Sequence, residues 1–479
     1  MKRLQRAALA GAFALPIALW ALTLAAVPAA AETLKDWKCT GEADIPWDEQ
    51  IAACTNALKS GRFAGPAAAV AMSNRGNAYY AKNDLDPAVA DYSQAIQFDP
   101  KYVNAYFNRG NAYKARGDFD RAVADYNQAI QLDPKFVYAY NNRGSVYQAR
   151  GELDRAIADY DRAMQLDPKY AFAYNNRGNV HYAKNDLDRA IADYNQAIQL
   201  DPKYAIAYDN RGNAYKAKGD VDRAIADYDQ AIQLDPKYAT AYDNRGNAYK
   251  AKGDLDRAIA DHSQAIQLDP RFAAAYNNRG IAYKAKNDLD RAIADYSEAI
   301  RLDPKYVFAY NNRGNAYKAK GDLDRAIADY SQAIQLDPKD TAAYNNRGNA
   351  HYAKSDLDRA VADYNQAIQL DPKYATAYDN RGNAYKAKGD LDRAIADHSQ
   401  AIQLDPRFAA AYNNRGIAYK AKDDLDRAIA DYSEAIRLDP KYATAFNNRG
   451  DAYKAKGDVD RANADFSEAT RLDPKNASH

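Results

Sequence analysis

The stretch Ala205–Tyr238, AIAYDNRGNAYKAKGDVDRAIADYDQAIQLDPKY, decides the fold of this chain. Tyr208 and Gly212 lie at helical spacing near its start, which predicts a first helix of about fourteen residues. Asp220 can cap a second helix, whose apolar residues again recur at helical spacing, and Pro236 ends that helix. The stretch therefore predicts a pair of helices joined by a short turn.

This pair of helices is repeated along most of the 479 residues. The dipeptide Arg-Gly recurs every 34 residues between Arg75 and Gly450, and Asp-Pro recurs in step between Asp99 and Pro474. Twelve copies occupy residues 69–476 without an insertion or a deletion. A period of this size indicates a stack of small units rather than separate globular domains. We therefore expect an all-α solenoid of twelve helix-turn-helix repeats with no β-strand.

The repeat resembles the tetratricopeptide repeat family, which carries aromatic, glycine, alanine and proline residues at fixed positions of a 34-residue pattern. The resemblance extends over residues 69–476. It implies a right-handed superhelix whose concave groove is lined by the first helix of each pair and holds extended or helical segments of protein partners. In Ala205–Tyr238 the matching residues are Tyr208, Gly212, Tyr215, Ala224, Tyr228, Ala231 and Pro236.

Each copy departs from the family pattern at one position, where an arginine such as Arg211 replaces the usual leucine. Every copy also has an aspartate on its second helix, for example Asp227. We expect this arginine to form an ion pair with that aspartate or with a residue across the boundary to the neighbouring repeat. A structural role is favoured over ligand binding.

Residues 1–31 have the features of an export signal. Lys2, Arg3 and Arg6 precede an uncharged, alanine- and leucine-rich run, and Ala29-Ala30-Ala31 supplies small residues for cleavage. This pattern predicts cleavage after Ala31 and a secreted or periplasmic protein without a later membrane span. An uncleaved membrane anchor is the alternative, because the run is long enough to cross a bilayer.

Residues 32–68 are expected to form an N-terminal cap on the stack. The segment Trp47–Leu58 resembles a lone second helix of the repeat. Cys39 and Cys54 are the two cysteines of the chain, and an exported protein favours a disulfide between them. The alternative is one buried thiol and one free thiol.

The last repeat is expected to close the other end of the stack. Asn463 and Thr470 replace the isoleucine that most copies carry at these places. Polar residues there suit an outer face that water can contact, as solenoid ends require. Residues 477–479 are a short tail.

Composition excludes several classes of function. Lys and Arg number 66 against 65 Asp and Glu, so net charge gives no general attraction to nucleic acid or to an anionic membrane. The sequence has no motif of nucleophilic, phosphate-binding or zinc-dependent catalysis. We expect no enzyme, no cofactor and no metal site. Four of the five histidines replace packing tyrosines of the repeat and are expected in the core: His181, His262, His351 and His398.

Partner binding is predicted on the first helices of the second to fifth repeats. Each first helix has an asparagine before the Arg-Gly pair, and the resemblance implies that these amides contact the bound chain. The second to fifth repeats add apolar side chains that later copies replace mostly with threonine or alanine. The alternative is that these side chains only pack against neighbouring helices and that the asparagines only bond adjacent backbone. The predicted residues are Asn108, Asn142, Asn176, Asn210, Phe107, Tyr138, Phe172, Ile206 and Tyr182.

Two classes of function fit the sequence. The first is an exported scaffold that binds segments of protein partners in its groove. The second is a polysaccharide-handling module of the cell envelope or export machinery, because tyrosine and asparagine side chains can stack on sugars and bond their hydroxyl groups. Residues 237–306 and 373–442 differ only at Asn287 and Asp423, which indicates that a block of four repeats was copied and favours a scaffold.

Overall fold

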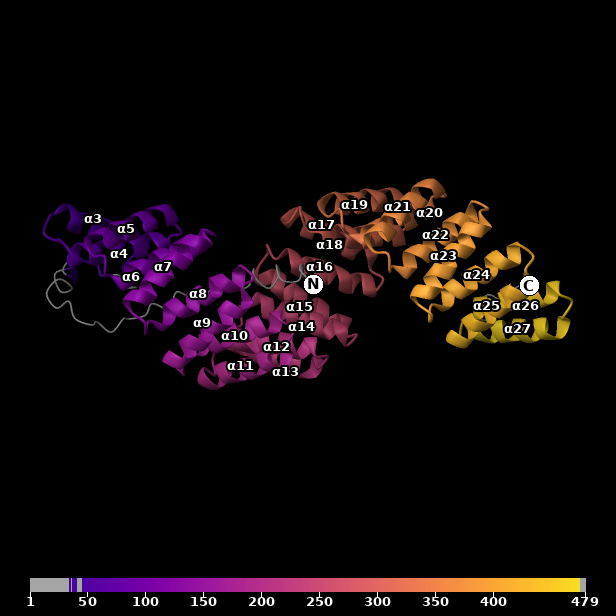
Figure 1. The fold of residues 1–479 in the computed structure, drawn as a ribbon, viewed down its shortest axis with the longest axis horizontal. Coiled ribbons are helices and arrows are strands. Elements are labelled where there is room, and N and C mark those ends of the chain that lie inside the picture. The colour runs from indigo at the N-terminus through magenta and orange to yellow at the C-terminus, as the bar shows by residue number, and fades with distance from the viewer. Residues whose placement is uncertain (1–33, 36, 41–44, 474–479) are drawn as a thin grey trace. The chain divides into compact units, whose positions relative to one another are not determined.

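The computed structural model describes residues 34–35, 37–40 and 45–473. The predicted signal segment 1–31 and the tail 477–479 lie outside these residues. The described residues form 25 helices, α3 to α27, and contain no β-strand, which confirms the all-α prediction (Figure 1). The chain divides into two compact units, unit 1 (residues 1–252) and unit 2 (residues 253–479), and each is described by itself.

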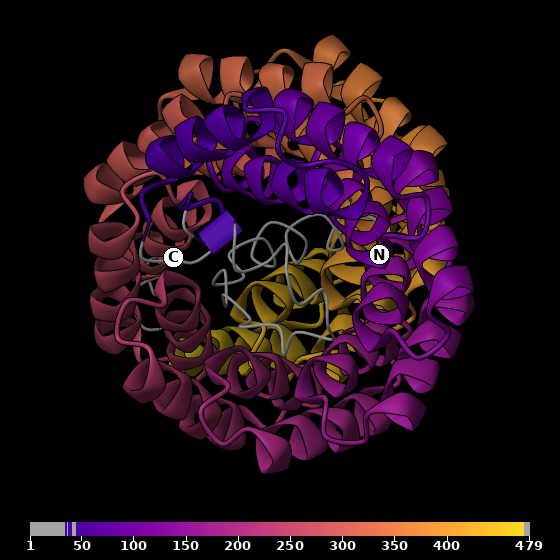
Figure 2. The same ribbon diagram turned by 90° about the vertical axis from the view of Figure 1, so that its left-hand side faces the viewer.

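In both units, even-numbered helices are first helices of a repeat and odd-numbered helices are second helices. Within unit 1, successive helices lie side by side along a curved row, coloured indigo to dark magenta (Figures 1 and 2). Unit 1 contains α3 (Trp47–Lys59), α4 (Pro66–Ala81), α5 (Leu85–Phe98), α6 (Val103–Ala115), α7 (Phe119–Leu132), α8 (Val137–Ala149), α9 (Leu153–Leu166), α10 (Ala171–Ala183), α11 (Leu187–Leu200), α12 (Ala205–Ala217), α13 (Val221–Leu234) and α14 (Ala239–Ala251). Unit 2 contains α15 (Leu255–Leu268), α16 (Ala273–Ala285), α17 (Leu289–Leu302), α18 (Val307–Ala319), α19 (Leu323–Leu336), α20 (Thr341–Ala353), α21 (Leu357–Leu370), α22 (Ala375–Ala387), α23 (Leu391–Leu404), α24 (Ala409–Ala421), α25 (Leu425–Leu438), α26 (Ala443–Ala455) and α27 (Val459–Leu472).

The turn between the two helices of a pair depends on one residue with positive φ. After α12 this residue is Gly219, with φ of 85°, a conformation that glycine adopts without steric cost. The carboxylate of Asp220 then accepts a hydrogen bond of 3.1 Å from the backbone N–H of Arg223 and caps α13. The chain therefore reverses within a few residues, as the sequence predicts.

A glycine and a tyrosine hold the two helices of a pair close together. Gly212 of α12 faces the ring of Tyr228, and a Cβ atom at this glycine would lie only 2.7 Å from a ring carbon. Tyr228 is fully buried and donates a hydrogen bond of 2.9 Å to Oδ1 of Asn213. Buried alanines such as Ala224 and Ala231 complete the contact. The core is therefore built from tyrosine rings between small residues.

The arginine that departs from the family pattern is ion-paired, as predicted, and also crosses a repeat boundary. Arg211 donates from Nε and Nη2 to the carboxylate of Asp227, at 2.8 and 2.6 Å. Its Nη1 donates to Oδ1 of Asn195 in the preceding repeat, at 2.6 Å. The same bidentate pair is found in the first and last repeats, Arg75 with Asp91 and Arg449 with Asp465. One guanidinium thus joins both helices of its repeat to the repeat before it.

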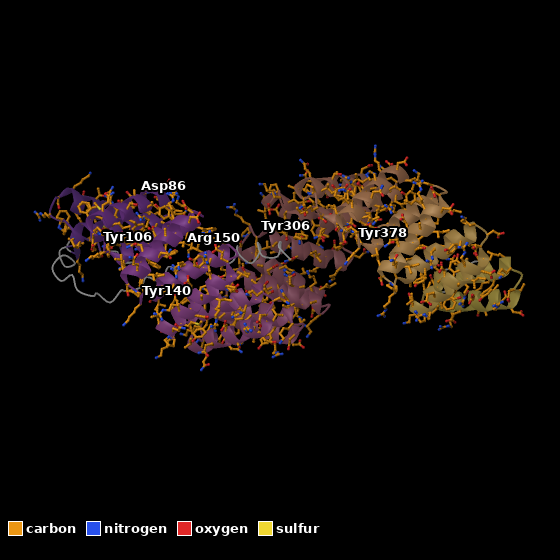
Figure 3. All side chains as sticks on the ribbon, in the orientation of Figure 1. Asp86, Tyr106, Tyr140, Arg150, Tyr306 and Tyr378 are labelled. Atoms are coloured by element: carbon orange, nitrogen blue, oxygen red, sulfur yellow. A yellow bond between two sulfur atoms is a disulfide. The ribbon has the colours of Figure 1, made fainter. Side chains whose placement is uncertain are left out.

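A second set of ion pairs lies on the surface and also joins neighbouring repeats. Arg116 pairs with Asp86 at 2.8 Å, and Arg150 pairs with Asp120 at 2.7 Å. Asp86 and Arg150 are labelled on unit 1 in Figure 3. The carboxylate of Asp86 is 81% exposed, so these pairs contribute little to stability compared with the buried arginine pairs.

Both ends of the repeat array differ from its inner repeats, and the predicted disulfide is present. Cys39 and Cys54 form a disulfide, with their Cα atoms 4.8 Å apart. Both cysteines are fully buried beside Leu34 and Ala71, so the segment before the repeats covers the apolar side of α4. In α27, Asn463 and Thr470 are exposed, whereas the matching isoleucines of inner repeats are partly buried.

Candidate partner-binding face

Six aromatic rings form a continuous row on unit 1, which we call the aromatic row. The row contains Phe107, Phe136, Tyr138, Tyr170, Phe172 and Tyr204. Neighbouring ring centroids along the row are separated by 5.0, 5.7, 5.5, 5.6 and 5.0 Å, which is the range for favourable aromatic pairs. All six side chains are partly exposed. The structure therefore brings three predicted residues, Phe107, Tyr138 and Phe172, onto one surface.

The other three rings were not predicted from the sequence. Phe136, Tyr170 and Tyr204 each lie at the last position of a repeat, immediately before the next first helix. Phe136 and Tyr170 each lie between predicted rings of successive repeats, and Tyr204 ends the row beside Phe172. The sequence did contain a signal for these three rings, because nearly every copy of the repeat ends with an aromatic residue. In the described residues of unit 2 a similar pair is formed by Tyr306 and Phe308, with centroids 6.3 Å apart.

The predicted asparagines bond to the preceding repeat. Asn108 donates from Nδ2 to Oδ1 of Asn77, at 3.0 Å, and Asn142 donates to Asn111 at 2.8 Å. Asn176 donates to Asn141 at 3.0 Å, and Asn210 donates to Asn175 at 2.9 Å. These bonds join side chains of adjacent first helices rather than adjacent backbone. An amide has two N–H groups, and each of these bonds uses one of them.

Two predicted residues, Tyr182 and Ile206, are not among the six rings of the row. Tyr182 packs against Ala190, Tyr194 and Ala214, and its burial raises the pKa of its hydroxyl. Ile206 is partly buried and occupies in α12 the place that Phe172 occupies in α10. Ile206 thus continues the row in register, whereas Tyr182 belongs to the packing between repeats.

Charged residues on the same first helices were missed by sequence reasoning. Nζ of Lys114 lies 3.3 Å from Oγ of Ser145, and burial lowers the pKa of Lys114 to about 8. The carboxylate of Asp209 is buried and accepts hydrogen bonds from Asn244 at 2.9 Å and from Asn213 at 3.2 Å. Burial raises the pKa of Asp209 from 3.8 to about 6. Periodicity gave no sign of these environments, because they depend on the neighbouring repeats.

We expect Asp209→Asn to stabilise unit 1 at pH 7.5 by about 1–2 kcal/mol. The folded carboxyl binds its proton more tightly than the unfolded carboxyl, so parent stability falls as the pH rises from about 4 to about 6 and stays lower above that range. An asparagine removes this loss, and Asn175 already occupies the same place in the preceding repeat. Hydrogen exchange of α12 and α14 amides at pH 4 and 7.5 checks this. An equal change in stability at both pH values would contradict the prediction that ionisation of Asp209 causes the loss.

The histidines belong to the core, as predicted. His262 and His398 are fully buried, and His181 and His351 are 7% exposed. Within residues 34–35, 37–40 and 45–473, no group of histidine, cysteine or acidic side chains is placed to hold a metal ion. Among the helices of the same residues, none has the length and apolarity that a membrane crossing requires.

Paired helices repeated every 34 residues, with a glycine that faces a tyrosine ring in most pairs, define a helical repeat protein. The profile of the TPR repeat matches residues 76–117, 110–151, 146–185, 178–219, 212–253, 246–286, 282–321, 314–355, 348–389, 382–423 and 418–457. A second profile, Tetratricopeptide repeat, matches residues 443–476. The chain belongs to the tetratricopeptide repeat family.

Solved structures similar to this chain are also repeat proteins. The APC/C heterotetramer Cut9-Hcn1 aligns at 16% identity with a TM-score of 0.50, covering 93% of this chain and 94% of that one. Yeast Tom70 aligns at 18% identity with a TM-score of 0.42, covering 84% and 92%. MamA aligns at 30% identity with a TM-score of 0.32, covering 34% of this chain and 96% of its own. No curated protein sequence matches significantly. The alignment with Cut9-Hcn1 agrees with the helical fold, and the profile matches establish the family.

Proposed function

We propose that the chain is an exported scaffold that binds a segment of a protein partner on the first helices of the second to fifth repeats. The observation that carries the proposal is the aromatic row, six partly exposed rings on one surface of unit 1. Aromatic side chains are frequent energetic anchors of protein interfaces. The amides of Asn108 and Asn176, which lie on first helices of the same repeats, could also bond the backbone of the partner segment.

The family supports this class of function. Tetratricopeptide repeats are interaction modules, and the sequence offers no catalytic motif. Export is proposed from the segment 1–31 and from the use of both cysteines in a disulfide, which is typical of oxidising compartments. A mature chain that begins at Glu32 in the extracytoplasmic fraction would support export. A chain retained in the cytoplasm with Met1 intact would contradict it.

The binding site is tested by replacing Phe107, Tyr138 and Phe172 together with alanine. We expect the partner to lose more than about 2 kcal/mol of binding free energy, because truncated aromatic anchors are costly at interfaces. Helix content should be largely unchanged, since the three rings are partly exposed and only Phe107 also packs against a buried ring, that of Tyr126 at 5.9 Å. The partner is first captured from an extracytoplasmic extract with the parent chain, and its affinity is then measured for both proteins.

A matched control uses the same positions of other repeats. Thr240, Ala274 and Thr376 replaced with serine or glycine should leave the affinity within about twofold, because no ring row passes over them. Equal weakening by both triple changes would disprove a localised site.

A glycan array tests the polysaccharide-handling alternative. Strong binding of one polysaccharide without a captured protein would favour that alternative, since a row of rings can also stack on sugars.

A further inference from the structure

A second feature of the first helices lies outside the aromatic row and concerns charge. Most repeats have a lysine four residues after the glycine of the Arg-Gly pair. Several of these lysines have a carboxylate nearby. Lys216 lies in the field of Asp209 and Asp243, and Nζ of Lys420 pairs with Asp451 at 2.9 Å. The charge of such a lysine is therefore balanced within the protein.

Lys284 of α16 and Lys318 of α18 are different. Within residues 253–473, the part of unit 2 that the structure describes, neither lysine forms an ion pair. Both side chains are partly buried, and burial lowers the pKa of each ammonium group. The two lysines hold matching positions on α16 and α18, the first helices of consecutive repeats, and the charge of Lys284 lowers the pKa of Lys318 further.

A copied helix shows why Lys284 has no partner. α16 and α24 have the same sequence, AAAYNNRGIAYKA, so Lys284 and Lys420 project from identical helices. The next first helices differ: α18 comes after α16, and α26 comes after α24. Lys420 meets Asp451 of α26, whereas the matching residue in α18 is Asn315, which accepts a hydrogen bond of 2.9 Å from Tyr330. One neutral side chain therefore leaves Lys284 and Lys318 without a counter-charge.

Two neighbouring ammonium groups that have lost part of their hydration are unfavourable without an anion, and a carboxylate brought beside them restores the balance. We propose that Lys284 and Lys318 form a subsite for two acidic side chains of a protein segment. Adjacent helices are about 10 Å apart. A segment in the polyproline II conformation rises about 3.1 Å per residue with three residues per turn, so carboxylates three residues apart would lie on one side at about that spacing. Asparagine amides on the same helices, which both donate and accept, suit a peptide backbone. This subsite is independent of the site proposed on unit 1.

The test measures binding of a fluorescein-labelled peptide, EAAEAAE, to the full chain by fluorescence anisotropy. A glutamine version of the peptide is the control for charge. Lys284→Met and Asn315→Asp should each weaken binding at least tenfold, the second because it supplies the internal partner that Lys420 already has. Lys420→Met should change binding less than twofold. Asp451→Asn should leave the first site intact and raise the number of bound peptides, since it frees Lys420.

Three outcomes would overturn the proposal. One is equal weakening by Lys420→Met and Lys284→Met, which would indicate general attraction to lysines. Another is unchanged affinity of Asn315→Asp when circular dichroism shows the parent helix content. The third is displacement of the peptide by oligogalacturonate at concentrations below those needed for unlabelled peptide, which would assign the subsite to an acidic polysaccharide. None of these results bears on the aromatic row, whose test uses different residues.

Discussion

Replacing Asp329 with alanine is expected to destabilise unit 2 by about 3–5 kcal/mol. The carboxylate of Asp329 is buried and accepts two hydrogen bonds from Arg313, from Nε at 2.8 Å and from Nη2 at 2.7 Å. Nη1 of the same arginine donates to Ser297 of the preceding repeat at 3.0 Å. Loss of the carboxylate leaves a partly buried guanidinium uncompensated at a repeat boundary. In a solenoid each repeat is stabilised by its neighbours, so α16 to α19 should lose protection together.

Hydrogen exchange of these helices measures the effect, and two variants control it. Asp290→Ala removes a carboxylate that pairs with Lys320 and is 84% exposed, so it should cost less than about 1 kcal/mol. Replacing both partners, Arg313→Met with Asp329→Leu, should cost much less than Asp329→Ala, because no charge is left unpaired. If Asp290→Ala and Asp329→Ala had equal effects, burial would not explain the role of this pair.

The sequence determines the repeat itself in detail because each decisive feature acts locally. Gly219 sets a turn, Asp220 caps a helix, and Gly212 admits the ring of Tyr228. These relations involve residues at most sixteen positions apart and recur in register, so one copy predicts the others. The Arg211–Asp227 pair could be predicted for the same reason.

The face that carries the candidate site was predicted only in part, because it depends on how one repeat lies against the next. Phe107 and Tyr138 could be identified as unusual residues, but their contacts with Phe136 depend on the stagger between repeats. The pairing of Lys420 with Asp451 has the same origin. A uniform 34-residue period also gives no indication that the chain divides after residue 252.

The two nearly identical segments, residues 237–306 and 373–442, share a feature that the pattern of a single repeat does not predict. Ile281 stands where most copies have asparagine, and the hydroxyl of Tyr296, which is buried, has no hydrogen-bond partner among the described residues. In the next repeat, Tyr330 donates to Asn315. The same change recurs at Ile417, where Tyr432 is likewise unsatisfied in the described structure. Copying thus preserved a locally unfavourable arrangement together with the helix that carries Lys284 and Lys420.

The second large effect is expected at the N-terminal end. Cys39→Ala combined with Cys54→Ala should destabilise the segment before the repeats by about 3 kcal/mol, since the disulfide closes a loop of fifteen residues. The same segment holds α4 through Asn74, whose Nδ2 donates to the carbonyl of Cys39 at 2.9 Å, and through a shared apolar cluster.

Without the disulfide, α3 should separate from α4 and expose an apolar face, so fraying should begin at this end of the chain. Hydrogen exchange of α3 and α4 should accelerate in the double variant and in the reduced parent to the same extent, while α26 and α27 remain unchanged. Agreement between variant and reduced parent would assign the effect to the cross-link. A faster rate in the variant alone would assign it to lost sulfur packing, and unchanged rates in both would show that the apolar cluster of Leu34, Ala57 and Ala71 holds the cap by itself.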